Sequence, residues 1–72
     1  MKVLRSTIVH PLKGRRDEVS NLLGELGWYL SQQPGFISGY EAKGEDDALW
    51  RVSLWDSRRD ADHAANQVHT IA

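Results

Sequence analysis

The residues best suited to chemistry are Arg51, Ser53 and Trp55, which alternate along the segment Leu49–Trp55. If this segment is a β-strand, alternating side chains point to opposite faces, so these three lie together on one face. An arginine there would bind a substrate oxyanion or stabilise the charge of a phenolate. A tryptophan there would stack on a planar ligand. We therefore predict a ligand-binding surface centred on these three residues.

Two of these residues also have structural interpretations, which the sequence leaves open. Trp55 is typical of a structural aromatic side chain at a dimer interface, where tryptophan is enriched. Arg51 is expected to form a cross-strand ion pair with Glu41 of the preceding strand. The alternative register would place Glu41 opposite Trp50 on the core face and bury an unpaired carboxylate, which is costly.

Further candidates lie outside this strand. Arg5 and Thr7 are expected on the same face of the sheet. That face would then carry two arginines, Arg5 and Arg51, and one glutamate, Glu41. One positive charge is left, which a ligand anion or a partner's acid would balance. His69, near the end of a predicted helix, is able to act as a general base near neutral pH, although a surface position is also typical. Arg51 and His69 are therefore the candidate catalytic residues. We find no Ser-His-Asp set and no glycine-rich phosphate loop.

Five elements must position these residues. Alternating and β-branched residues predict strands over Val3–Val9, Phe36–Lys43 and Leu49–Trp55, the last two joined by a hairpin loop over Gly44–Ala48. An amphipathic helix precedes Pro34-Gly35, and Trp28 lies off its apolar stripe. Ser57 is expected to cap a second, alanine-rich helix together with Asp60.

The apolar even-numbered residues of Leu49–Trp55 predict which face is the core. We expect Trp50, Val52 and Leu54 to face the helices, and the odd-numbered residues to face away from them. The preferred register places Gly39 opposite Ser53. It also places Ile37 opposite Trp55, and Tyr40 opposite Val52 on the core side.

The sequence of 72 residues predicts a single domain over residues 1–72. Such a domain buries only about 60% of the surface that its unfolded chain exposes, and is usually stabilised by disulfides, metals or oligomerisation. The chain contains no cysteine, and its three histidines have no standard metal spacing. We therefore expect a homodimer with neither a metal nor a cofactor.

The composition also limits the classes of partner that the chain is expected to bind. The net charge of −1 argues against nucleic acid, which requires a basic surface. No apolar run approaches the roughly 20 residues that span a bilayer, so no membrane partner is expected and a cytoplasmic location is the default. The element order β-α-β-β-α predicts an α+β, ferredoxin-like fold that lacks the usual fourth strand. The first strand would then be an exposed edge, which pairing with a second copy would cover.

Two segments carry a resemblance to a known family. They are Pro34-Gly35-Phe36-Ile37-Ser38-Gly39-Tyr40-Glu41 and Leu49-Trp50-Arg51-Val52-Ser53-Leu54-Trp55-Asp56-Ser57. With the turn Val9–Arg15, they resemble the antibiotic biosynthesis monooxygenase domain of the dimeric α/β-barrel superfamily. The resemblance implies a homodimer whose sheets pair into a barrel, and a cavity for an apolar polycyclic or quinone-like molecule. It also implies that Trp55 lines this cavity.

The resemblance further implies what the ligand undergoes. Some members oxygenate an aromatic substrate without metal or flavin, and others degrade haem. The haem-degrading members use an asparagine in the first strand, where this chain has Arg5, Ser6 and Thr7, and a histidine from which His63 is displaced by about one residue. Haem degradation is therefore not expected.

Two hypotheses remain. The first is a small dimeric protein that binds an aromatic or quinone-like molecule and oxygenates it, with a substrate phenolate held by Arg51 or Arg5 on Trp55 and supplying electrons to oxygen. The second is a non-catalytic interaction module with the same face packed solid. A cavity of about 300 Å³ or more beside Trp55 would favour the first.

Overall fold

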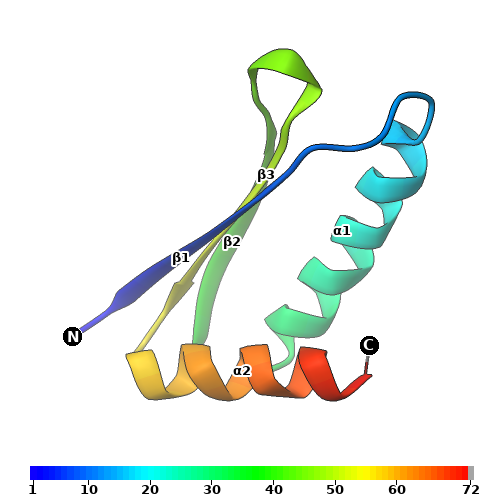
Figure 1. The fold of residues 1–72 in the computed structure, drawn as a ribbon. Coiled ribbons are helices and arrows are strands. Elements are labelled where there is room, and N and C mark those ends of the chain that lie inside the picture. Colours follow the sequence, from blue (N-terminus) through cyan, green and yellow to red (C-terminus); the bar gives the residue numbers. More distant parts are fainter. Residues whose placement is uncertain (72) are drawn as a thin grey trace.

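A computed structural model describes residues 1–71, and the side chains of residues 1–67. The elements are β1 (Val3–Val9), α1 (Arg16–Ser31), β2 (Phe36–Lys43), the 3-10 turn η1 (Glu45–Asp47), β3 (Leu49–Trp55) and α2 (Arg58–Ile71). The strands form one layer, α1 lies along one side of it, and α2 crosses one end (Figure 1). The predicted α+β, ferredoxin-like class and the bounds of the predicted strands are confirmed.

The sheet has the order β1-β3-β2, and both pairings are antiparallel. β1 is an edge strand, as the sequence predicts. In the β2–β3 hairpin Glu41 lies opposite Arg51 and Gly39 opposite Ser53, which confirms the predicted register. On the other side of β3, Arg5 lies opposite Ser53 and Thr7 opposite Arg51. The central strand β3 therefore brings the candidate residues of all three strands together.

The predicted pairing of Ile37 with Trp55 is wrong. An irregularity between Phe36 and Ser38 shifts the register, so that Phe36 lies opposite Trp55. The two rings pack edge to face with their centroids 5.4 Å apart. A local bulge of this kind re-aims side chains, and here it turns an aromatic ring into the core while Ile37 stays exposed.

The predicted assignment of the two sheet faces is also wrong. The odd-numbered residues of β3 are buried and the even-numbered ones are not. Trp55 is only 1% exposed and packs in a cluster with Ala61 and Ala64 of α2. Trp50 and Tyr40, which were expected in the core, are 37% and 67% exposed. Arg51, Ser53 and Trp55 therefore face the helices, and we call the opposite side of the sheet the open face.

The reversal has a steric reason, which is the size of the residues on the helices. The side chains of α2 against Trp55 are alanines, so a large indole fits between helix and sheet. In α1, a Cβ atom at Gly27 would overlap Nη1 of Arg51, so the absence of a side chain there makes room for the guanidinium group. The face of β3 that carries Arg51, Ser53 and Trp55 thus packs against small residues on both helices.

The start of α2 is capped as predicted. The backbone N–H of Asp60 donates to Oγ of Ser57 at 3.1 Å, and the Ser57 hydroxyl donates to Oδ2 of Asp60 at 3.0 Å. This capping satisfies one of the free N–H groups of the first helical turn. Since α2 covers Trp55, the cap also fixes one wall of the core.

Replacing Ser57 with alanine is expected to lower the free energy of unfolding by about 1 kcal/mol, the usual value of such a cap. Urea denaturation followed by circular dichroism measures the change. The matched control is Ser20→Ala on the exposed side of α1, which should leave stability the same or slightly higher. Equal effects of the two substitutions would show that the cap contributes nothing.

Within the described part of the chain, neither helix combines the length and the apolar character that crossing a membrane requires.

Candidate ligand-binding site

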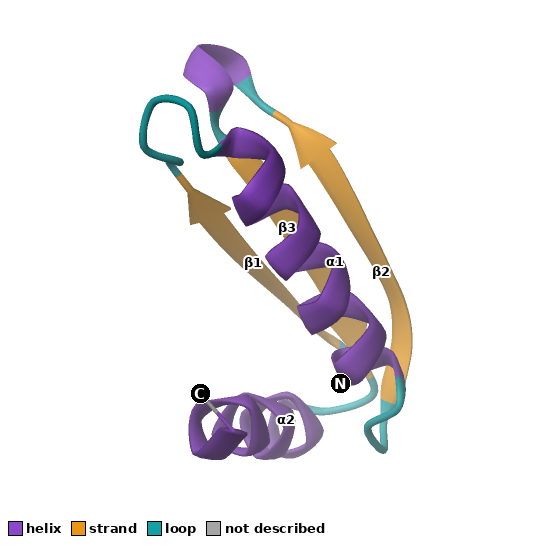
Figure 2. Cartoon of the chain, turned by 90° about the vertical axis from the view of Figure 1, so that its right-hand side faces the viewer, coloured by secondary structure: helices purple, strands orange, loops and turns teal. Residues whose placement is uncertain are grey.

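A cavity of about 250 Å³ lies where the helix-facing side of the sheet meets both helices. Figure 2 shows how α1 runs over the sheet while α2 crosses its end. The residues that line the cavity are Arg5, Ser6, Thr7, Leu26, Leu30, Ser53, Trp55, Ala61 and Ala65. Of the predicted ligand-binding residues, Trp55, Ser53, Arg5 and Thr7 are thus brought together, and Arg51 is not among the lining residues.

The walls of the cavity are apolar, with polar groups on the strand side. Leu26 and Leu30 of α1 line it together with the indole of Trp55, and Ala61 and Ala65 contribute small surfaces from α2. The indole Nε1 of Trp55 donates to Oγ of Ser53 at 2.9 Å, which fixes the orientation of the ring. The Ser53 hydroxyl proton itself has no acceptor within the described residues, so it remains available to a ligand.

Arg5 is the cation of the cavity. It forms an ion pair with Asp62 of α2, and both side chains are partly exposed. Nε of Arg58, one turn earlier in α2, lies 3.9 Å from Oδ2 of the same Asp62. The rim of the cavity therefore carries one carboxylate shared between two arginines.

Arg51 lies in the core rather than at the cavity. Its side chain is 9% exposed, and its Nη1 donates to Oε1 of Glu41 at 3.1 Å. The predicted cross-strand pair is therefore present, but on the helix side of the sheet. A Cβ atom at Gly39 would lie 2.8 Å from Nη2, so the guanidinium fits between two glycines, Gly39 and Gly27. Its Nε is buried and has no hydrogen-bond partner among the described residues.

Neither of the two described histidine side chains, His10 and His63, lines this cavity. The side chain of His69, the candidate general base, lies outside the described residues. His63 is exposed on α2 and is not among the residues that line the cavity. The described residues include no group of three His, Cys, Asp or Glu side chains that would hold a metal ion.

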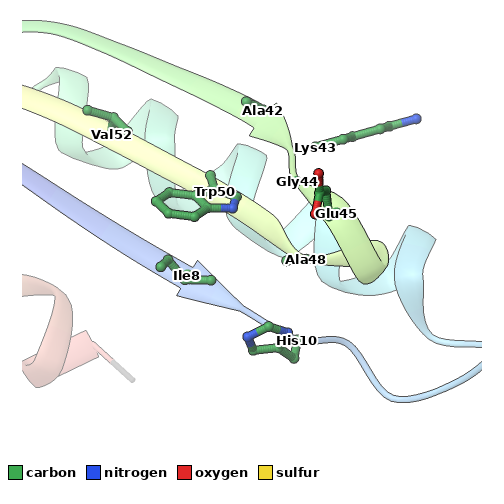
Figure 3. Close-up of a pocket in the computed structure, with 9 residues that line it drawn as sticks. All are labelled: Ile8, His10, Ala42, Lys43, Gly44, Glu45, Ala48, Trp50 and Val52. Atoms are coloured by element: carbon green, nitrogen blue, oxygen red, sulfur yellow. The ribbon is translucent and has the colours of Figure 1, made fainter.

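A second hollow, of about 690 Å³, lies on the open face near the hairpin (Figure 3). It is wider and more open than the helix-side cavity. Its lining residues are Ile8, His10, Ala42, Lys43, Gly44, Glu45, Ala48, Trp50 and Val52. A Cβ atom at Gly44 would overlap the indole nitrogen of Trp50, so glycine is needed for this placement of the ring.

Sequence reasoning missed this hollow because it assigned Trp50 and Val52 to the core. The alternation along β3 did place the two residues on one face, and that signal was correct. The alternation could not show whether the helices cover this face or the opposite one. The open face is therefore an apolar surface that the described chain leaves uncovered.

Comparison with solved structures identifies the fold. A candidate monooxygenase from Shewanella loihica PV-4 superimposes with a TM-score of 0.82 at 19% identity, over 97% of this chain and 77% of that one. A haem-degrading protein from Mycobacterium tuberculosis, solved free of haem, gives a TM-score of 0.75 at 18% identity, over 92% of this chain and 79% of that one. No protein-family model matches the chain, and the search of curated proteins found no match.

Both likenesses cover nearly all of this chain and show that it shares the α+β, ferredoxin-like fold of the two structures. The family resemblance in the sequence is thereby confirmed for the fold of this chain. It extends over nearly the whole chain, which includes every element that lines the helix-side cavity.

Proposed function

We propose that this protein binds a small aromatic molecule in the helix-side cavity, and that it does so as a homodimer joined through the open face. The observation that carries the proposal is the cavity beside Trp55, although its volume of about 250 Å³ is below the roughly 300 Å³ that this hypothesis was expected to require. The alternative, a non-catalytic interaction module, requires this side of β3 to be packed solid. A cavity with one fixed indole wall and a few convergent polar groups is instead the usual form of a small-molecule site.

The size of the cavity limits the ligand. At about 250 Å³ it is slightly smaller than the 300–1,000 Å³ that is typical of ligand sites, which suits a molecule of one or two rings. Leu26, Leu30 and Trp55 supply the apolar surface for such rings. A naphthalene derivative is therefore a suitable probe.

Oxygenation is the activity that this proposal assigns to the bound ligand. One of the two structural neighbours is described as a candidate monooxygenase. Arg5 would stabilise a phenolate, which donates electrons to molecular oxygen. With 1-naphthol, one oxygen atom would become the second carbonyl of 1,4-naphthoquinone and the other would leave as water, and the naphthol would supply all four electrons. Oxygen uptake, with product identified by mass spectrometry under labelled oxygen, measures this reaction.

Filling the cavity is expected to weaken 1-naphthol binding by about tenfold or more, because the new ring occupies the ligand's volume. The variants are Ala65→Phe on α2 and Thr7→Phe on β1, which enlarge opposite walls at exposed positions. Isothermal titration calorimetry measures the affinity. His63→Phe, exposed on α2 but away from the cavity, is the control and should bind as the parent protein does. Unchanged binding in both cavity variants would refute the proposed site.

The homodimer part of the proposal rests on the open face. Its exposed large apolar residues are Leu4, Ile8, Tyr40 and Trp50. Contiguous apolar surface of this kind marks an interaction site. Two sheets packing face to face, about 10 Å apart, would bury it. A second copy is the partner that the small size of the chain favours, since one 72-residue domain alone is marginally stable.

A further inference from the structure

We propose that the helix-side cavity selects an aromatic carboxylate, whose two oxygens are bound by Arg5 and Ser53. This inference rests on the aromatic-ligand binding proposed above and not on the oxygenation, because a carboxylate bound to Arg5 takes the place of the phenolate; it adds the chemical class of the ligand. It arises from three features of the cavity: the spacing of its donors, the charge pattern at its rim and the character of its walls.

The two donors are neighbours across the sheet. Arg5 and Ser53 lie directly opposite each other on β1 and β3, and both line the cavity. Side chains at opposite positions of an antiparallel pair start about 5 Å apart. A planar carboxylate placed between them accepts from the guanidinium with one oxygen and from the Ser53 hydroxyl with the other. The Ser53 side chain is buried and its proton is unused by the described residues, so a ligand oxygen would satisfy it.

The ion pairs at the rim allow Arg5 to change its partner. In this structure Arg5 is paired with Asp62, while Nε of Arg58 lies 3.9 Å from the same carboxylate. When a ligand carboxylate takes Arg5, Asp62 therefore keeps a cation beside it. The other arginine of this sheet face, Arg51, is already paired with Glu41. The cavity thus offers one exchangeable positive charge to the ligand.

The walls select against other anions. No carboxylate is among the lining residues, and the one at the rim, Asp62, is the group that a ligand carboxylate would replace on Arg5. One arginine balances one negative charge, and the apolar walls formed by Leu26, Leu30 and Trp55 would leave further charges unpaired. Phosphate esters and dicarboxylates are therefore poor ligands, whereas a ring bearing a single carboxylate places its apolar part against apolar walls.

The test compares 2-naphthoate with its neutral analogue 2-naphthylmethanol by isothermal titration calorimetry on the full chain. We expect 2-naphthoate to bind at least about tenfold more tightly, because charge-assisted hydrogen bonds are the stronger ones. Arg5→Met should abolish this preference, and the ratio of the two affinities cancels general effects on the cavity. Arg59→Met, which removes an exposed arginine of α2, is the matched control and should retain the preference.

Asp62→Asn provides an independent variant, since it removes the competitor for Arg5. It is expected to tighten 2-naphthoate binding severalfold and to leave 2-naphthylmethanol unchanged. Equal affinities for the two probes in the parent protein would overturn the carboxylate inference while the aromatic site stands. Weaker 2-naphthoate binding in Asp62→Asn would overturn it as well. Absence of binding by either probe would overturn both this inference and the proposed function.

Discussion

Replacing Gly27 with alanine is expected to lower the free energy of unfolding by about 2 kcal/mol, although alanine is the better helix former. The reason is the guanidinium of Arg51, which occupies the space where the new Cβ atom would lie. Arg51 would have to move away from Glu41, its partner at 3.1 Å. A buried cation that loses its partner is strongly destabilising.

The matched control for this substitution lies one helical turn earlier. Gly24 is exposed, and a Cβ atom there would meet nothing within 4 Å. Gly24→Ala is therefore expected to raise the free energy of unfolding by about 1 kcal/mol through helix propensity alone. Urea denaturation should show that the free energy of unfolding falls in Gly27→Ala and rises in Gly24→Ala, each relative to the parent protein. A stabilising Gly27→Ala would show that the guanidinium does not require this space.

A double substitution separates the collision from other effects at Gly27. In an Arg51→Met background the guanidinium is absent, so Gly27→Ala should cost little or even stabilise the helix. The two substitutions are thus expected to be strongly non-additive. Additive losses would place the cost of Gly27→Ala somewhere other than Arg51.

Replacing Trp50 with aspartate is expected to weaken the proposed homodimer by about thirtyfold or more, the loss typical of a central interface tryptophan. The side chain lies on the open face, in the hollow shown in Figure 3. A carboxylate there would be buried without a partner when two sheets pack together. Sedimentation equilibrium over a range of protein concentrations measures the dissociation constant.

Trp28 provides the comparison for this experiment. It is 69% exposed on α1 and lies off the helix's apolar stripe, so Trp28→Asp should leave association unchanged. If Trp28→Asp dissociates the protein and Trp50→Asp does not, the interface lies on α1 and the open face is not the dimer surface. A parent chain that stays monomeric at all concentrations would contradict the homodimer.

The strands were predictable because their signals are local. Period-two patterns set the limits of Phe36–Lys43 and Leu49–Trp55. The predicted pairing of Glu41 with Arg51 gave the correct register, although its premise, that this pair faces away from the helices, was wrong. The bulge at Phe36 was not predictable in this way. It depends on the packing of that ring against Trp55, a contact between residues of two strands that no local pattern encodes.

The sheet faces were misassigned because apolar alternation shows which residues avoid water, not which element covers them. Trp50, Val52 and Leu54 form the more apolar set, yet they lie on the open face. The small residues of the helices, rather than the large residues of the strands, indicate which face of the sheet the helices cover. Gly27 and the alanines of α2 indicate where bulky groups must fit, and these groups are Arg51 and Trp55.

The sequence predicted which residues form the candidate site, but it did not predict what each of them does there. The face shared by Arg5, Thr7, Ser53 and Trp55 follows from strand alternation and register, and the structure brings these residues around one cavity. That Arg51 is enclosed, while Arg5 reaches the cavity, depends on the position of α1 over the sheet. The ion pair of Arg5 with Asp62 likewise depends on how α2 crosses the end of the sheet.

Because the three tryptophans differ in exposure, their fluorescence can report on separate parts of the molecule. Trp55 is buried against the cavity, whereas Trp28 and Trp50 are exposed on opposite sides of the molecule. Dissolved iodide should therefore quench the fluorescence of Trp28 and spare Trp55, and it should reach Trp50 only when the proposed homodimer dissociates. A protein carrying Trp28→Phe and Trp50→Phe would emit from Trp55 alone, so that its spectrum would follow occupation of the cavity without a label.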